Sequence, residues 1–241
     1  WLFLLLLAPS IAAVPIDVSQ VTVTPHWNEL YGIVSVRPTP VGIFVVLRQG
    51  QVRDFLDWQS STSSLVIDVS HQAYNWWDHA ATAFELHPDY PQQPYGYLRI
   101  AKQTGWGDNC QRTDTDARLY CDTSSVLLRI TLNNELQAID TFVLLDDMCN
   151  SSPRHDGGEL RFVGSDLLWT TGDAAQFDGL DAGTPFDACY NHSAGPLQGG
   201  YRAQRNDFVQ GKVYLIPSNL LLVNRQLSIH ELTLVAKGLR N

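Results

Sequence analysis

The chain has 241 residues, a formal net charge of −9, and 16 lysine and arginine residues scattered along its length. This length is enough to bury a full core in one large β domain or in two ordinary domains. Because the balance is acidic and no basic cluster is present, the composition argues against nucleic acid as a partner.

An apolar run, WLFLLLLAPSIAA, occupies residues 1–13 and ends in small residues. It has the pattern of the apolar region and cleavage site of a secretory signal, and it is too short to span a bilayer. The run begins with Trp1, without the charged start of a signal. We therefore interpret residues 1–13 as a truncated signal peptide and the chain as a fragment of a secreted protein with no membrane span.

Short β-rich runs bounded by Gly, Pro, Asn or Asp recur along the rest of the chain, and no long segment has helical spacing. The clear strand predictions are 32–36, 42–47, 52–58, 96–101, 126–132, 160–163, 167–171, 212–216 and 230–236. Turn residues join two pairs of them, at 49–50 and at 164–166. Paired strands at spacings of several tens of residues fit propeller blades better than a sandwich. The sequence therefore predicts an all-β protein.

Four cysteines follow the signal-like segment, which indicates an oxidising compartment and two disulfides. Three connectivities are possible, and the one we favour pairs Cys110 with Cys121 and Cys149 with Cys189. The glycosylation sequons at Asn150 and Asn191 each lie beside one member of the second pair. Their positions predict exposed, glycosylated loops.

Four sequence elements occur in the order found in the soluble quinoprotein glucose and sorbosone dehydrogenases. They are AFELHPDYPQQPYGYLRI at 83–100, RHDGGELRFVGSDLLWTTGDAA at 154–175, QGKVYLIPSN at 210–219 and KGLRN at 237–241. The chain resembles that family from about Val21 to Asn241, and a chance match of four ordered elements is improbable.

The resemblance implies a six-bladed β-propeller with its active site at the mouth of the central channel. Residues 14–241 would then form the N-terminal part of a glucose/sorbosone dehydrogenase-like domain, with about three blades and the start of a fourth. Such a partial ring would expose strand edges and blade faces that an intact ring covers.

The resemblance also implies a reaction, in which an aldose or another alcohol is oxidised by hydride transfer to pyrroloquinoline quinone. It identifies His155 as the general base and Asp173 as the carboxylate that fixes the imidazole tautomer. His155 precedes one strand of the predicted hairpin and Asp173 follows the other, so both should lie at the same end. Arg240 and Asn241 match residues that contact the cofactor.

One assigned position departs from the family pattern. The alignment places Asp78 where the enzymes have a glutamine that lines the cofactor, and a carboxylate there would repel a tricarboxylate. The calcium ion of the family is held largely by carbonyls beyond residue 241, so we assign no metal ligand in this chain. Asp173, Asp178 and Asp181 lack the spacing of an EF-hand and are interpreted as turn residues.

Two other functions compete with the enzyme hypothesis. The chain is also similar to Hedgehog-interacting-protein-like propellers, which act as binding proteins. The alternative is thus a non-catalytic, glycosylated propeller that binds a protein or carbohydrate through long loops such as 174–210. A third hypothesis is a secreted carbohydrate-binding module that uses Trp76 and Trp77.

Overall fold

The computed structural model describes residues 30–75, 78–103, 123–150, 155–175, 189, 191–195 and 197–239. In these residues the chain forms three four-stranded antiparallel sheets, each a meander of consecutive strands. The first sheet contains β1 (Ile33–Thr39), β2 (Gly42–Leu47), β3 (Gln51–Phe55) and β4 (Ser64–Asp68). The second contains β5 (Ala81–Leu86), β6 (Tyr95–Gln103), β7 (Thr123–Leu132) and β8 (Ala138–Asn150). The third contains β9 (Leu160–Val163), β10 (Asp166–Thr170), β11 (Lys212–Ile216) and β12 (Thr233–Lys237).

Helical structure in the described residues is confined to short segments of three to six residues. They are α1 (Ser218–Leu221) and the 3-10 turns η2 (His192–Ala194), η3 (Gly199–Gln204) and η4 (Ile229–Glu231). No helix in this part of the chain is long and apolar enough to cross a membrane.

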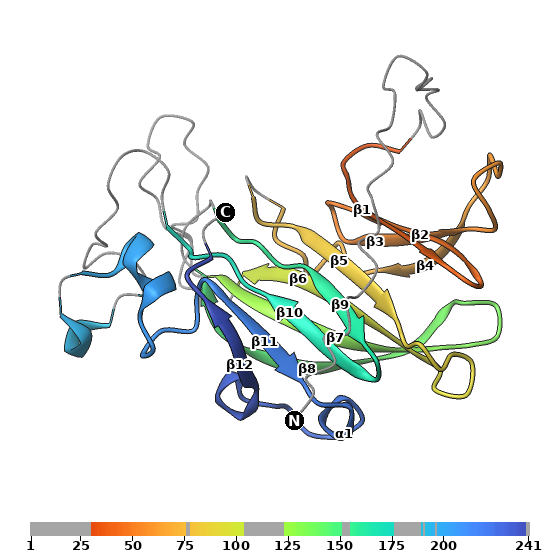
Figure 1. Cartoon of the computed structure of the whole chain (residues 1–241). Helices are drawn as coiled ribbons and strands as arrows, with labels where there is room; N and C mark the ends of the chain where they lie inside the picture. The colour runs from red at the N-terminus through yellow and green to blue at the C-terminus, as the bar shows by residue number, and fades with distance from the viewer. Residues whose placement is uncertain are drawn as a thin grey trace, which may run out of the picture.

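The three sheets follow one another in space as they do in sequence, with the second between the other two (Figure 1). Four-stranded meanders arranged side by side are the blades of a propeller. The all-β prediction and the prediction of about three blades are confirmed, and residues 240–241, where a fourth would begin, lie outside the described residues.

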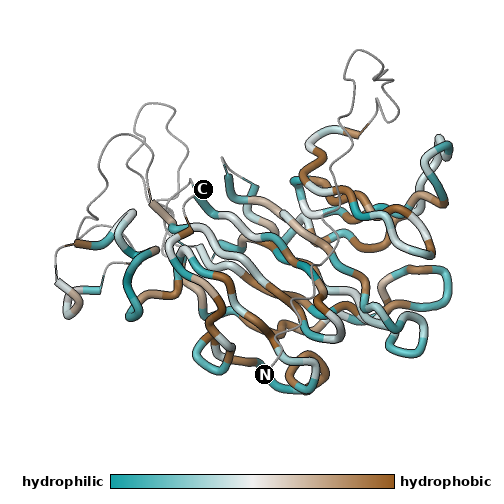
Figure 2. Tube along the Cα trace, viewed as in Figure 1, coloured by the Kyte–Doolittle hydropathy of each residue, from teal (hydrophilic) through white to brown (hydrophobic). Residues whose placement is uncertain are grey.

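Hydrophobic side chains from neighbouring sheets interlock to form two main cores. The first core joins the first and second sheets through Phe44, Val52, Phe84, Leu98 and Val126. The second core joins the second and third sheets through Tyr97, Leu127, Leu145, Leu167 and Trp169. Figure 2 shows hydrophobic stretches along the strands and hydrophilic residues in many of the connecting loops. Each buried Leu or Phe contributes about 1.5–3 kcal/mol, so the contacts between blades stabilise the ring.

An ion-pair cluster links the first strands of the three sheets. Glu85 on β5 lies 2.9 Å from the Nε of Arg37 on β1 and 3.1 Å from the Nη1 of Arg161 on β9. Burial raises the pKa of Glu85, and the two guanidinium groups oppose that rise. One carboxylate therefore contacts both neighbouring blades.

A second polar link joins β7 to the outer part of the third sheet. The guanidinium of Arg129 donates to the carbonyls of Leu221, at 3.1 Å, and Val223, at 2.9 Å. It also lies over the rings of Tyr95 and Phe142. This buried arginine thus fixes the second sheet to the turn around α1.

All nine predicted strands are present, although the last one begins later than expected because η4 occupies 229–231. Three strands were not among the predictions: β4, β5 and β8. β5 begins with alanine and β8 contains three aspartates, and both residue types are depleted in strands. Packing between blades stabilises these segments in spite of their weak local signal.

Candidate active site

The β9–β10 hairpin positions the two predicted catalytic residues. Leu160 pairs with Trp169 at the end of the ladder, and backbone hydrogen bonds continue beyond it. Gly172 N donates to Asp156 O at 3.0 Å, and Ala174 N donates to His155 O at 3.2 Å. The extended pairing brings the segments before β9 and after β10 together at one end of the hairpin.

The side chains of His155 and Asp173 meet there, as predicted. Nδ1 of His155 lies 2.9 Å from Oδ1 of Asp173. The two residues are 7% and 0% exposed. An ionised carboxylate only accepts hydrogen bonds, so when Asp173 is ionised and the imidazole is neutral, Nδ1 is the donor and Nε2 is left as the acceptor. This is the tautomer that a general base requires.

The backbone on both sides of the hairpin end adopts the left-handed conformation. The φ angles of His155 and Ala174 are 54° and 52°. This conformation costs a residue with a Cβ about 1–2 kcal/mol. Gly172 lies so close to the other segment that a Cβ on it would be 1.8 Å from His155 O. The close approach of the two segments therefore depends on glycine at 172.

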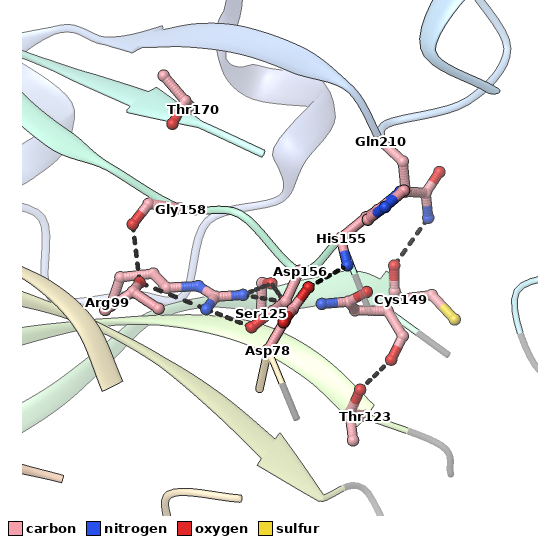
Figure 3. A network of polar contacts seen from close by, with 12 residues as sticks. Asp78, Arg99, Thr123, Ser125, Cys149, His155, Asp156, Gly158, Thr170 and Gln210 are labelled. Atoms are coloured by element: carbon pink, nitrogen blue, oxygen red, sulfur yellow. Dashed lines mark hydrogen bonds and ion pairs between the residues drawn. The ribbon is translucent and has the colours of Figure 1, made fainter. Parts of the chain in front are cut away.

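Asp78, which precedes β5 in the second sheet, also reaches the site. Its Oδ2 accepts a hydrogen bond from the backbone N–H of His155 at 2.8 Å (Figure 3). Asp78 thus contacts the backbone of the segment that carries His155. The structure brings Asp78, His155 and Asp173 together.

A buried ion pair that the sequence did not predict lies next to His155. Arg99 on β6 and Asp156, the residue after His155, are 0% and 1% exposed and bind each other through both carboxylate oxygens. Ser125 on β7 also accepts a hydrogen bond from Arg99. A charge in the middle of the apolar strand sequence YGYLRIA was the signal that could have found this pair.

A disulfide lies close to the site in sequence. Cys149, at the end of β8, is joined to Cys189 as predicted, with a Cα–Cα distance of 5.6 Å. Gln210 donates from Nε2 to the carbonyl of Cys149 at 2.7 Å. The bridge thus fixes Cys189 beside the end of β8.

The two sequons differ in their surroundings. Asn150 is 1% exposed, whereas Asn191 is exposed and its Oδ1 accepts a hydrogen bond from Ser193 N at 3.0 Å. A glycan needs an accessible side-chain amide. In this conformation the sequon at Asn191 presents its side chain and the one at Asn150 does not.

Several predicted residues lie outside the described part of the chain: Arg240, Asn241, Cys110, Cys121, Trp76, Trp77, Asp178 and Asp181. Within the described ranges, no group of three or more His, Cys, Asp or Glu side chains is arranged to hold a metal ion.

The His155–Asp173 pair fits the proton chemistry of a quinone-linked dehydrogenase. The imidazole is buried against its carboxylate, so its orientation is fixed before a substrate arrives. The described charged groups beside it include Asp78, which binds the His155 amide, the Arg99–Asp156 pair, and the buried Arg202, which donates to the carbonyl of Ala174 at 3.3 Å. Contact with the carboxylates of a quinone would fall to Arg240 and Asn241.

No protein-family model matches the chain, and neither does any curated protein. The chain does match solved structures. A glucose dehydrogenase-type oxidoreductase from Thermus thermophilus superposes with a TM-score of 0.56 at 18% identity, over 79% of this chain and 44% of that one. The soluble aldose sugar dehydrogenase of Escherichia coli, in its apo form, gives a TM-score of 0.55 at 18% identity, over 81% and 46%.

Two of the similar structures are quinone-binding proteins. The PQQ-bound aldose sugar dehydrogenase of Streptomyces coelicolor gives a TM-score of 0.51 at 13% identity, over 79% of this chain and 48% of that one. The PQQ domain of a Coprinopsis cinerea pyranose dehydrogenase gives 0.52 at 12% identity, over 88% and 40%. The chain thus has the fold of quinone-linked sugar dehydrogenases, as the sequence resemblance implied, and spans less than half the length of each.

Proposed function

We propose that the chain belongs to a secreted oxidoreductase that oxidises an aldose or another alcohol by hydride transfer to pyrroloquinoline quinone. The observation that supports this most is the buried hydrogen bond between His155 Nδ1 and Asp173 Oδ1, 2.9 Å long, at the end of the hairpin. The fold shared with a PQQ-bound sugar dehydrogenase and a PQQ domain supports the choice of the cofactor class.

In this proposal His155 acts as the general base. Its Nε2 accepts the proton of the substrate hydroxyl, and Asp173 stabilises the imidazolium that forms. The quinone, when bound, supplies the acceptor for the hydride that leaves the substrate carbon. Asp78 keeps the backbone of His155 in place during the transfer of the proton.

Arg240 and Asn241 would hold the quinone, with the guanidinium pairing with its carboxylates. Calcium would help to bind and polarise the quinone. The disulfide between Cys149 and Cys189 supports residence in an oxidising compartment, which accords with residues 1–13 acting as a signal and residues 14–241 as the mature domain.

The test is dye reduction by the protein supplied with calcium, pyrroloquinoline quinone and an aldose. Loss of a general base lowers turnover by about 10²–10⁴-fold, so His155→Ala should lose nearly all activity. His71→Ala is the matched control, because His71 is exposed and lies outside the hairpin. Undiminished turnover in His155→Ala would falsify the assignment of the base.

The charge distribution favours a second candidate function, a non-catalytic glycosylated propeller that binds a protein or carbohydrate partner. Around the hairpin end, the described carboxylates of Asp78, Asp156 and Asp173 outnumber the guanidinium groups of Arg99, which is bound to Asp156, and Arg202, which donates to the carbonyl of Ala174. This balance does not favour a tricarboxylate cofactor. Calorimetry with the quinone and calcium separates the two functions. A saturable heat supports the enzyme, and its absence supports the binding protein.

A further inference from the structure

The ion pair between Arg99 and Asp156 is buried and bidentate, unlike a contact on the surface. Nη1 of Arg99 donates to Oδ2 of Asp156 and Nη2 donates to Oδ1, so the two planar groups face each other through two parallel bonds. Ser125 Oγ lies 3.3 Å from the same carboxylate. Because bidentate pairs of this kind define both distance and angle, they orient whatever is attached to the carboxylate.

The loop that follows Asp156 rests on the same arginine. Gly158 has a φ of 120°, and a Cβ on it would lie 2.8 Å from Arg99 Nε. Its carbonyl accepts a hydrogen bond from Thr82 Oγ1 at 2.7 Å, and Thr82 in turn accepts from Arg99 Nη1 at 3.4 Å (Figure 3). Two strands of the second sheet, β5 and β6, thus hold the segment from 156 to 158.

His155 lies between two such attachments. On one side its backbone N–H is bound by Asp78, and on the other side the next residue, Asp156, is bound by Arg99. Arg99 lies in the second sheet and Asp78 just before it, whereas Asp173, which binds the imidazole, follows β10 of the third sheet. The left-handed conformation of His155 persists because its surroundings determine it from both sides.

We propose that Arg99 and Asp156 are positioning residues for His155, which set the direction of its imidazole toward Asp173 across the interface between the second and third blades. The proposal rests on the function proposed above for His155. A pair of apolar side chains could fill the same space, and such replacements of buried ion pairs often preserve stability. They would not reproduce the two parallel hydrogen bonds that hold the residue beside the base.

The test is the tautomer of His155, read from its ¹⁵N imidazole shifts in protein labelled at histidine and assigned with His155→Ala. The wild-type chain should show the proton on Nδ1. In the double variant Arg99→Met/Asp156→Leu, and in the isosteric Asp156→Asn, we expect this preference to be lost while the chain remains folded by circular dichroism. Should the double variant fail to fold, Asp156→Asn decides on the same criterion.

Arg129→Met is the matched control, because Arg129 is also a buried arginine that links the second sheet to the third. It should lower the stability and leave the His155 shifts unchanged. Wild-type shifts in a folded Asp156→Asn protein would overturn the proposal, as would an equal change in Arg129→Met, which would indicate general loosening.

The measurement needs neither quinone nor turnover. If the chain reduces no dye but the tautomer responds to Asp156→Asn, the positioning role holds and the proposed reaction fails. If dye reduction depends on His155 but the tautomer is insensitive to Arg99 and Asp156, the reaction holds and the positioning role fails.

Discussion

The amide of Ala174 donates a hydrogen bond to the carbonyl of His155 over 3.2 Å, and both residues have positive φ angles. The pairing joins the residue after Asp173 to His155 itself. The contact between the imidazole and the carboxylate therefore depends on an unusual backbone conformation in both segments, and substitutions of neighbouring glycines test that dependence.

Gly172→Ala should be strongly destabilising. The new Cβ would meet His155 O at 1.8 Å, a clash with backbone atoms that cannot swing aside. We expect the free energy of unfolding in urea to fall by about 3 kcal/mol or more. Gly164→Ala is the control, because its φ is 63° with no atom within 4 Å of the Cβ, and the backbone strain alone costs about 1–2 kcal/mol. Equal losses in the two variants would contradict the proposed clash.

Asp78→Ala should release the backbone amide of His155. Hydrogen exchange of that amide should become at least about tenfold faster, because hydrogen bonds to charged groups contribute about 1.5–3 kcal/mol. Asp78→Asn retains an oxygen acceptor in nearly the same place and should show a smaller increase. Exchange that is equally slow in all three proteins would show that Asp78 does not protect the amide.

The buried side chain of Lys212 predicts a pH dependence of stability. Its Nζ donates to the carbonyls of Arg202, Ala203 and Gln210, and burial lowers its pKa to about 8. The unfolded chain, in which this pKa is about 10.4, then binds more protons between these values. The contribution of Lys212 to stability should thus rise with pH across this window and fall as the pH drops toward 8.

Urea unfolding of wild type and Lys212→Met between about pH 7.5 and 11 checks this expectation, since the window brackets the folded and unfolded pKa values. The difference in unfolding free energy should grow with pH by at most about 1.4 kcal/mol per unit. Parallel pH curves for the two proteins would mean that Lys212 has an ordinary pKa in the folded chain.

Removal of the bridge between Cys149 and Cys189 should lower stability without altering the fold. The two cysteines are 40 residues apart in sequence, and a loop of this size corresponds to about 4 kcal/mol of chain entropy. The measurement is the urea midpoint of the Cys149→Ser/Cys189→Ser protein. An unchanged midpoint would imply that the unfolded chain is already constrained between these positions.

The sequons should respond differently to substitution. In a secreting host that attaches N-glycans, Asn191→Gln should increase electrophoretic mobility, because that side chain is exposed. Asn150→Gln should leave the mobility unchanged, since Asn150 is buried. A mobility shift for Asn150→Gln would mean that the glycan is attached before the end of β8 is covered.

The sequence predicted the all-β class, the pairing of Cys149 with Cys189 and the meeting of His155 with Asp173. The last of these followed from local information, because one short hairpin connects the two residues. Contacts between sheets were harder to predict. Asp78 and Arg99 lie 77 and 57 residues from their partners in the third blade, and no local pattern encodes which blade faces which.

Strand prediction failed for a related reason. β5 and β8 begin with alanine or contain aspartates, and they form strands because neighbouring sheets cover them. Runs of β-branched and aromatic residues, such as Gly42–Leu47, were correctly predicted because their composition favours strands. All six residues of that strand are buried.

The contacts that support the His155–Asp173 pair come unevenly from the three blades. Asp78, Arg99 and Ser125 all come from the second blade, His155 and Asp173 from the third, and none of these described contacts comes from the first. Harmful changes confined to residues 33–68 should therefore reduce how much folded protein accumulates, whereas changes at the junction of the other two blades should reduce what each folded molecule can do. Natural variants in the two regions would then differ in effect: the first kind would lower the amount of folded protein, and the second would impair the folded molecule itself.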